Sequence, residues 1–210
     1  MTSRTSQPLI GIGLMLSAMA ILPFLDVVAK FLGEQNVPIM EIVWARLFFG
    51  MVMTAPLVWK MDGARSLIPQ RPVVHTIRAI FLVAATALFF WALKFQGIAE
   101  TLAIFFVQPL VITMLSPLVL GEKVGMRRWL AVAVGFMGTL IIIRPGFQGL
   151  NPGVFMALGA GTSLALYMLL TRRIAGSASA MTTTFLTSRA GAVLTSIAVV
   201  VVWQAPTPQQ

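Results

Sequence analysis

The sequence predicts an all-α protein that crosses a membrane several times. Charged residues make up only 10% of the chain and cluster between long apolar runs, while 58% of the residues are hydrophobic. Mean hydropathy is +0.92, which no soluble domain of this size could sustain. Hydrocarbon offers no hydrogen-bond partner, so backbone amides must be satisfied within each segment. Runs without period-2 alternation are therefore predicted as helices and not as barrel strands.

Seven apolar runs define the predicted helices. A helix needs roughly 20 residues to cross a hydrocarbon core about 30 Å thick, and somewhat fewer where the bilayer thins. The first run resembles a secretory signal at Ala18-Met19-Ala20, but its hydrophobicity continues to Val28, so we predict a retained first helix. The runs cover residues 9–28, 39–59, 77–93, 98–120, 129–143, 153–171 and 181–203.

Basic residues are distributed unequally between alternate loops. One side carries only Lys30, Lys94 and Arg144. This bias predicts a cytoplasmic N-terminus in a multi-pass plasma (inner) membrane protein. Because the basic residues of this +9 chain do not form one surface, we attribute them to membrane orientation and predict no nucleic-acid partner. The opposite, richer side carries Arg4, Lys60, Arg65, Arg71, Arg78, Lys123, Arg127, Arg128, Arg172 and Arg173.

The segment from Gly153 repeats features of the segment from Gly11. The pattern predicts one five-helix unit over residues 9–145 and the first two helices of a second unit over 153–203. Five is odd, so the second unit is predicted to be inverted in the membrane, and we expect it to be truncated. The aligned charged positions are Lys30 with Arg172 and Arg46 with Arg189.

Three stretches resemble a known family. Residues 92–110, with Gln108-Pro109, are followed by Gly121-Glu122 within 118–123 and by the glycine-bearing run 129–144. Together they resemble the EamA domain, the repeat unit of the drug/metabolite transporter superfamily. That resemblance implies ten helices in two inverted repeats and passage of small metabolites through a central cavity. This sequence departs from the pattern by ending after seven helices.

Four charged residues are candidates for substrate binding or for scaffolding. Asp26 and Lys30 are spaced i, i+4, which allows an interfacial ion pair or a carboxylate in the pathway. Arg46 lies inside a span, where an isolated arginine costs at least roughly 2.5 kcal/mol, so it must reach a carboxylate, a carbonyl or a wet cavity. Arg189 is its repeat counterpart, and the pair could clamp an anionic substrate or serve as scaffold.

A polar step and two tryptophans complete the candidate substrate site. Gln108 lies near the middle of its run, followed by Pro109, which should bend the helix and free a carbonyl. Transporters tend to place their binding site at such a point. Trp44 and Trp91 lie within their helices, where they could stack on a planar substrate or face lipid.

Other polar residues are predicted to be structural. Glu122 should belong to a charge network at the turn after the fourth helix, and Tyr167 should pack in the core while its hydroxyl finds a partner. His75, the only histidine, is predicted to be a solvated residue of the basic loop that also holds Arg78. The chain lacks cysteine, which excludes thiolate chemistry and thiolate metal sites.

These features favour a secondary transporter of a small metabolite that works by alternating access. The sequence has no phosphate-binding Gly-x-x-x-x-Gly-Lys loop for ATP, and we predict neither a cofactor nor a metal. Proton coupling through Asp26 is a hypothesis. The substrate could be an amino acid, a nucleotide-like or vitamin-like compound, or a drug. The alternative is a non-transporting subunit or inactive fragment; a homo-oligomer is compatible with the sequence, whereas scattered carboxylates disfavour an enzyme.

Overall fold

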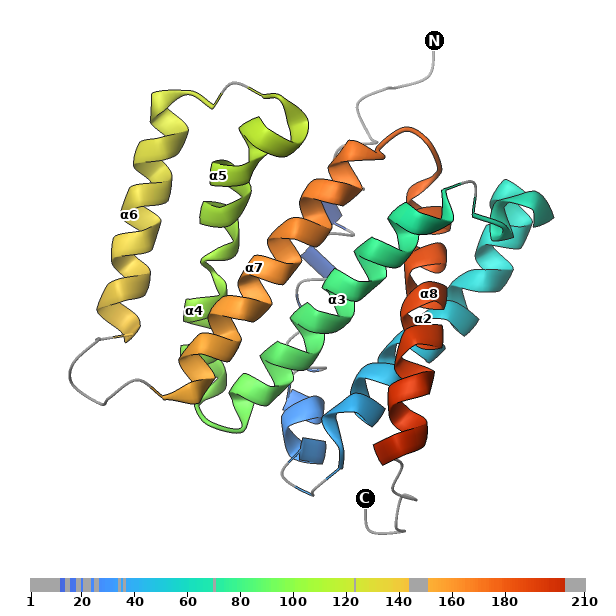
Figure 1. Cartoon of the computed structure of the whole chain (residues 1–210), viewed down its shortest axis with the longest axis horizontal. Coiled ribbons are helices and arrows are strands. Elements are labelled where there is room, and N and C mark those ends of the chain that lie inside the picture. Colours follow the sequence, from blue (N-terminus) through green and yellow to red (C-terminus); the bar gives the residue numbers. More distant parts are fainter. Residues whose placement is uncertain are drawn as a thin grey trace.

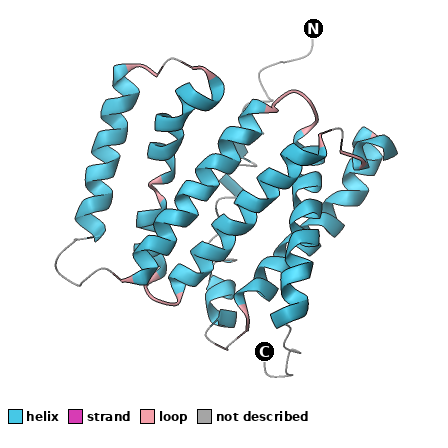
Figure 2. Cartoon of the chain, in the orientation of Figure 1, coloured by secondary structure: helices cyan, strands magenta, loops and turns pink. Residues whose placement is uncertain are grey.

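The computed structural model is a bundle of helices, and no strand occurs in the part of the chain that it describes (Figure 2). The described residues are 12–13, 16–17, 20, 24, 27–33, 35, 37–69, 71–122, 124–143 and 151–202. Asp26 and much of the first predicted run, 9–28, lie outside them. Helices α2, α3, α7, α8 and the stretch Ile98–Leu120 are long and apolar enough to cross a membrane. The chain is therefore a multi-pass helical membrane protein.

The helices follow the predicted runs closely. The run 98–120 is divided into α4 and α5, and the run 129–143 forms α6, which is not among the five candidate spans. In chain order the elements are α2 (Ile39–Asp62), the short 3-10 helix η1 (Ala64–Leu67), α3 (Pro72–Leu93), α4 (Ile98–Phe105), α5 (Gln108–Leu120), α6 (Met126–Ile143), α7 (Pro152–Arg173) and α8 (Ala180–Val202).

Helix ends follow local sequence rules. Pro72 and Pro152 occupy the first positions of α3 and α7, where the missing N–H is not needed by the helix. The side chain of Asn151 caps α7 by accepting a hydrogen bond from the Gly153 amide at 3.0 Å. Gly121 ends α5 with a left-handed backbone (φ 70°), a conformation that glycine adopts without a Cβ clash. These signals fix where α3 and α7 begin and where α5 ends.

Two antiparallel helix pairs form the centre of the bundle. Along α2 and α8, Trp44 meets Ser196, whereas Asp62, at the other end of α2, meets Thr182. Along α3 and α7 the same reversal holds, since Arg78 bonds Thr171 near one end and Phe95 lies against Gly153 near the other. Figure 1 shows the α3 and α7 ribbons running side by side.

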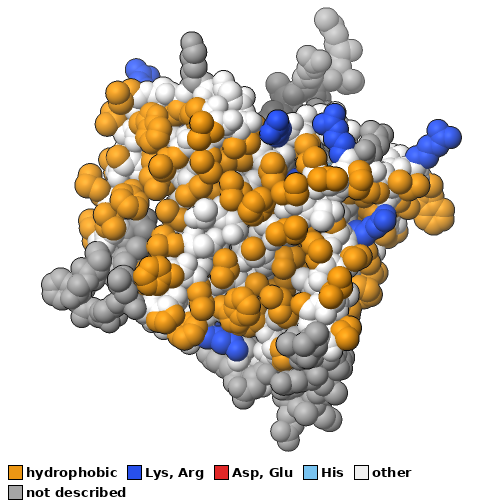
Figure 3. All heavy atoms as spheres, in the orientation of Figure 1, with side chains coloured by type: hydrophobic (Ala, Val, Ile, Leu, Met, Phe, Trp, Pro, Cys, Tyr) orange, Lys and Arg blue, Asp and Glu red, His pale blue; other side chains and the backbone are white. Residues whose placement is uncertain are grey.

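Core packing joins these four helices, while other large apolar side chains face outward. Val43 and Leu47 of α2, Phe90 of α3, Ala160 of α7 and Ala192 of α8 belong to one buried cluster. Helix α6 contacts α4 and α5 and forms one edge of the bundle (Figure 1). Hydrophobic side chains cover the face seen in Figure 3, and basic groups lie mainly toward its margins. Such a surface suits lipid and not water.

Candidate functional site

The span Ile98–Leu120 is interrupted halfway along its length. Helix α4 ends at Phe105 and α5 begins at Gln108, with a turn at Phe106 and Val107 between them. Pro109 has no N–H, so it cannot donate to the carbonyl of Phe105, four residues earlier. The bend predicted at Pro109 is thus confirmed, and it leaves backbone groups without their helical partners at membrane depth. Such backbone needs protein or water beside it.

Gly161 of α7 lies directly against this break. A Cβ placed on Gly161 would be 2.7 Å from the Phe105 carbonyl oxygen and 2.8 Å from a methyl group of Val107. Only a glycine permits the two backbones to approach so closely. Ala157, four residues earlier on the same face of α7, is buried as well. The close contact at Gly161 fixes the break beside α7.

Gln108 reaches the same helix. Its side-chain amide nitrogen lies 2.8 Å from the sulfur of Met168, and the residue is half-buried. A thioether is a weak acceptor. This weak hydrogen bond places the amide beside α7.

Arg78 approaches α7 from α3 and is fully buried, with 0% of its surface exposed. Its Nε donates to the Thr171 hydroxyl at 3.1 Å, and one terminal nitrogen donates to the Tyr167 hydroxyl at 3.4 Å. The other terminal nitrogen lies 3.3 Å from Nδ1 of His75. No carboxylate of the described residues contacts this guanidinium. A buried charge without a counter-ion depends on such neutral acceptors.

One turn of α7, residues 167–171, therefore receives polar side chains from two directions. Arg78 reaches it from α3 and Gln108 reaches it from α5. We call this segment the α7 turn. It is the candidate functional site, because polar groups there adjoin the span that is broken inside the membrane.

Two residues of this region were misplaced by sequence reasoning. His75 was predicted to be a solvated loop residue and Arg78 was counted with the charges of that loop, which is wrong: both are buried in the first turns of α3. The apolar run begins at residue 77, but the helix begins at Pro72. The proline provided the missing signal, because its fixed φ favours the first helical position and would have brought His75 and Arg78 into the helix.

The other predicted site residues lie elsewhere. Trp44 donates to the Ser196 hydroxyl at 2.8 Å and stacks on Phe48 with ring centroids 5.0 Å apart. Arg189 is exposed on α8 and donates to the Leu67 carbonyl at 2.8 Å. Arg46 is exposed on α2, and Trp91 is half-buried against the core. Of the predicted site residues, the structure thus brings Gln108 to the α7 turn. Trp44 joins α2 to α8, and Arg189 joins α8 to η1.

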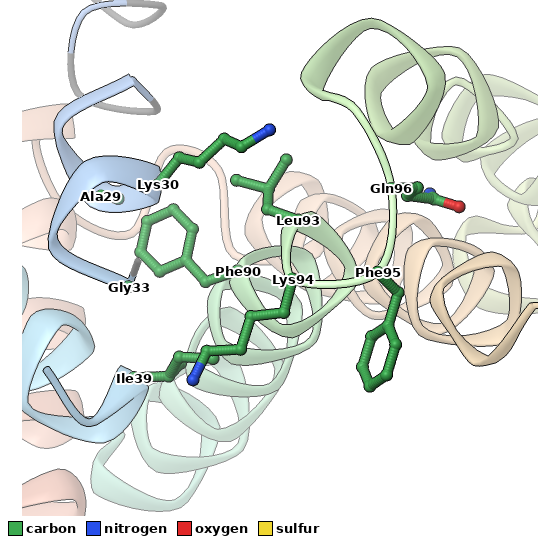
Figure 4. A pocket seen from close by; sticks show the side chains of 9 residues that line it. All are labelled: Ala29, Lys30, Gly33, Ile39, Phe90, Leu93, Lys94, Phe95 and Gln96. Carbon is green, nitrogen blue, oxygen red and sulfur yellow. The ribbon is translucent and has the colours of Figure 1, made fainter. Parts of the chain in front are cut away.

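Two pockets open at opposite ends of α3. The first, which we call the lysine pocket, has a volume of about 500 Å³ and is lined by Lys30, Lys94, Phe90 and Ile39, among others. Figure 4 shows Lys30 reaching it from the segment before α2, and Lys94 from the end of α3. The second, the basic pocket, has a volume of about 420 Å³ and includes His75 in its lining. A pocket therefore lies at each end of α3.

Glu122 links two helix ends. Its carboxylate accepts from Arg172 of α7 at 3.1 Å and from the hydroxyl of Ser116 at 2.9 Å. The sequence predicted a network with the neighbouring Lys123, Arg127 and Arg128, but the ion pair that Glu122 forms among the described residues is with Arg172. Its basic partner comes from α7, which brings the ends of α5 and α7 to the same side of the bundle.

A helical bundle with five helices long and apolar enough to cross a membrane defines a polytopic membrane protein. The profile of the EamA-like transporter family matches residues 9–144. The chain belongs to this family, as its motifs predicted.

Individual relatives agree with this assignment. An S-adenosylmethionine uptake transporter of Rickettsia bellii (strain RML369-C) is 27% identical over 94% of this chain and 67% of its own length. A riboflavin transporter of Vibrio cholerae serotype O1 is 29% identical over 84% of this chain and 60% of its own length. The chain thus spans 60–67% of the length of these two relatives. The names point to transport and not to catalysis.

A solved structure shares the fold. One crystal structure of another protein superposes with a TM-score of 0.64 over 98% of this chain and 70% of its own, at 22% sequence identity. The likeness concerns the arrangement of helices alone.

Proposed function

We propose that the protein is a secondary transporter of a small metabolite that works by alternating access. The observation that carries the proposal is the broken span, in which Gln108 meets the α7 turn and Gly161 packs against the break. Broken helices supply polar groups at membrane depth, where a solute must be held between the two sides. The pockets at the two ends of α3 supply places where such a solute could enter and leave.

The proposed substrate contacts come from both halves of the chain. Gln108 offers an amide at the break, Arg46 and Arg189 offer charges on α2 and α8, and Asp26 would supply a carboxylate. Trp44 and Trp91 would contact a planar ring. Relatives named for S-adenosylmethionine and riboflavin favour a nucleotide-like or vitamin-like compound, since both of those molecules carry planar rings.

The proposed architecture is a five-helix unit over 9–145 followed by two helices of an inverted unit over 153–203. The antiparallel contacts of α2 with α8 support it, because the second helices of two inverted units must run in opposite directions. The excess of basic residues in alternate loops supports a cytoplasmic N-terminus, and we place the protein in the inner membrane.

Reconstitution tests the proposal directly. The chain would be placed in liposomes, and uptake of radiolabelled riboflavin and S-adenosylmethionine would be measured against protein-free vesicles. We expect saturable uptake of at least one compound, and loss of that uptake in Gln108→Leu with an unchanged melting temperature. Met114→Leu, an exposed change on the same helix, is the control. If neither riboflavin nor S-adenosylmethionine enters faster than it enters empty vesicles, the proposed transport of a nucleotide-like or vitamin-like compound by this chain is contradicted.

A further inference from the structure

The basic pocket gathers polar groups from three separate parts of the chain. It lies where α2 ends, η1 and the start of α3 follow, and the connection between α7 and α8 passes. Its volume of about 420 Å³ falls in the range of small-ligand sites, roughly 300–1,000 Å³. The polar groups that matter here are Asp62, Arg65, Arg71, His75, Ser179 and Thr182.

The one carboxylate in this lining is already engaged. Asp62 accepts hydrogen bonds from the hydroxyl of Ser179 and, at 2.8 Å, from that of Thr182. Arg65 and Arg71 are exposed, and neither guanidinium contacts a carboxylate among the described residues. The two guanidinium groups therefore give this lining positive charge that no carboxylate of the described residues neutralises by an ion pair.

A second layer of positive charge lies behind the first. His75 is only 7% exposed, and its Nδ1 lies 3.3 Å from a terminal nitrogen of the fully buried Arg78. The charge of Arg78 is not offset by any described carboxylate, and it is surrounded by protein. A low-dielectric wall of this kind strengthens and focuses the positive potential in the pocket.

We propose that the basic pocket binds a phosphate group, with Arg65 and Arg71 as its direct ligands and His75 at its base. The fork of a guanidinium suits the several oxygens of a phosphate, and two of them can share one group. Exposed basic residues alone would serve only to orient the chain in the membrane. Three features distinguish this phosphate site from ordinary surface charge. The arginines line a pocket, hydroxyl groups already hydrogen-bond Asp62, and the charge of Arg78 lies buried behind His75.

Phosphate chemistry could reach the pocket from two sources. Under the proposed topology the pocket faces the cytoplasm at the level of the headgroups, so an anionic phospholipid could place its phosphate there. A free phosphate or a phosphorylated solute could enter from water. The inference does not rest on transport, and its test measures binding alone.

The test compares two variants of equal charge. Arg65→Gln/Arg71→Gln removes the pocket ligands, whereas Arg127→Gln/Arg128→Gln removes two exposed charges at the start of α6, outside the pocket. Each protein is purified in maltoside detergent, which contains no phosphate. Its melting temperature is measured against inorganic phosphate, with chloride at matched ionic strength as the control. Dioleoylphosphatidylglycerol adducts are counted by native mass spectrometry, with dioleoylphosphatidylcholine as the control lipid.

We expect the wild type and the α6 variant to bind at least one phosphate probe, and the pocket variant to bind it about tenfold more weakly. Binding of inorganic phosphate identifies a soluble source, whereas binding of phosphatidylglycerol alone identifies a lipid headgroup. If both double variants bound the phosphate probe equally weakly, binding would depend on surface charge in general, and the proposal would be overturned. Absence of stabilisation and of adducts in the wild type would overturn it too. The two single substitutions, each at an exposed position, give the same comparison should the double variant melt early.

Discussion

Arg78 of α3 and Tyr167 of α7 contact each other in two ways. The guanidinium carbon lies 5.1 Å from the centre of the tyrosine ring, and one terminal nitrogen donates to the ring hydroxyl at 3.4 Å. The π face and the phenol oxygen therefore both stabilise a cation that is cut off from solvent. This contact, together with the Thr171 bond, fastens α3 to α7 at the candidate site.

The bond from Arg78 to Thr171 should matter for stability. Thr171→Val removes the acceptor of Arg78 Nε and leaves a buried charged donor unpaired, which should lower the free energy of unfolding by about 1–3 kcal/mol. Denaturation in mixed detergent micelles measures it. Thr76→Val is the matched control, because each hydroxyl also bonds the carbonyl four residues earlier. Equal losses of unfolding free energy in the two variants would show that the hydrogen bond from Arg78 to Thr171 does not stabilise the fold.

The close approach of Gly161 to the break predicts a steric effect. Gly161→Ala would place a methyl group 2.7 Å from the Phe105 carbonyl oxygen, a backbone atom that cannot move aside cheaply. We expect a loss of about 1–3 kcal/mol in unfolding free energy. Gly138→Ala on α6 has no atom within 4 Å of the new Cβ and should be neutral or stabilising by up to about 1 kcal/mol. A neutral Gly161→Ala would mean that the helices separate there without penalty.

The helices were predictable because the bilayer makes the sequence pattern simple. In lipid, an apolar run without period-2 alternation must form a helix, so the runs from 39–59 to 181–203 coincide with helices α2 to α8. Residues with a strong helix-end preference locate helix ends that hydropathy misses. Pro72, for example, marks the start of α3 five residues before the apolar run begins. The count of seven helices and the inverted repeat stay predictions, since the run 9–28 is only partly described.

The site was predictable only in part. Gln108 could be identified because its polarity and the adjacent proline are visible along a single helix. Arg78 could not, since its role depends on Tyr167 and Thr171, about ninety positions away, and no local rule joins them. Trp44 shows the same limit, because its partner Ser196 becomes visible only when α8 folds back against α2. Side-chain partners across helices are set by packing and not by periodicity.

Pro109 and Gly161 should be energetically coupled. Pro109→Ala restores an N–H that can bond the Phe105 carbonyl, which would draw this oxygen back along the helix axis and away from Gly161. The penalty of Gly161→Ala should therefore be smaller in the Pro109→Ala background, by at least about 0.5 kcal/mol. A double-mutant cycle of unfolding free energies measures the difference. Strict additivity would indicate that the proline does not hold this carbonyl in place.

Glu122 should depend more on Ser116 than on Arg172. Glu122 and Arg172 are 42% and 48% exposed, so a Glu122→Gln/Arg172→Gln cycle should give a coupling below about 1 kcal/mol. Ser116 is fully buried and donates to the same carboxylate, so the Glu122→Gln/Ser116→Ala cycle should give the larger coupling. The opposite order would mean that the ion pair is better shielded from water than its exposure indicates. Raising salt should weaken only the Arg172 term.

The absence of cysteine makes the membrane orientation directly measurable. Gly97→Cys lies in the turn between α3 and α4, and Ala175→Cys lies in the turn between α7 and α8. Both positions are exposed, and a Cβ at Gly97 meets no atom within 4 Å, so the fold should tolerate both changes. In intact spheroplasts, a membrane-impermeant maleimide should label Gly97→Cys alone, because the arginine-rich loops remain inside. Disruption of the membrane should expose both thiols, and labelling of Ala175→Cys alone in intact cells would reverse the proposed topology.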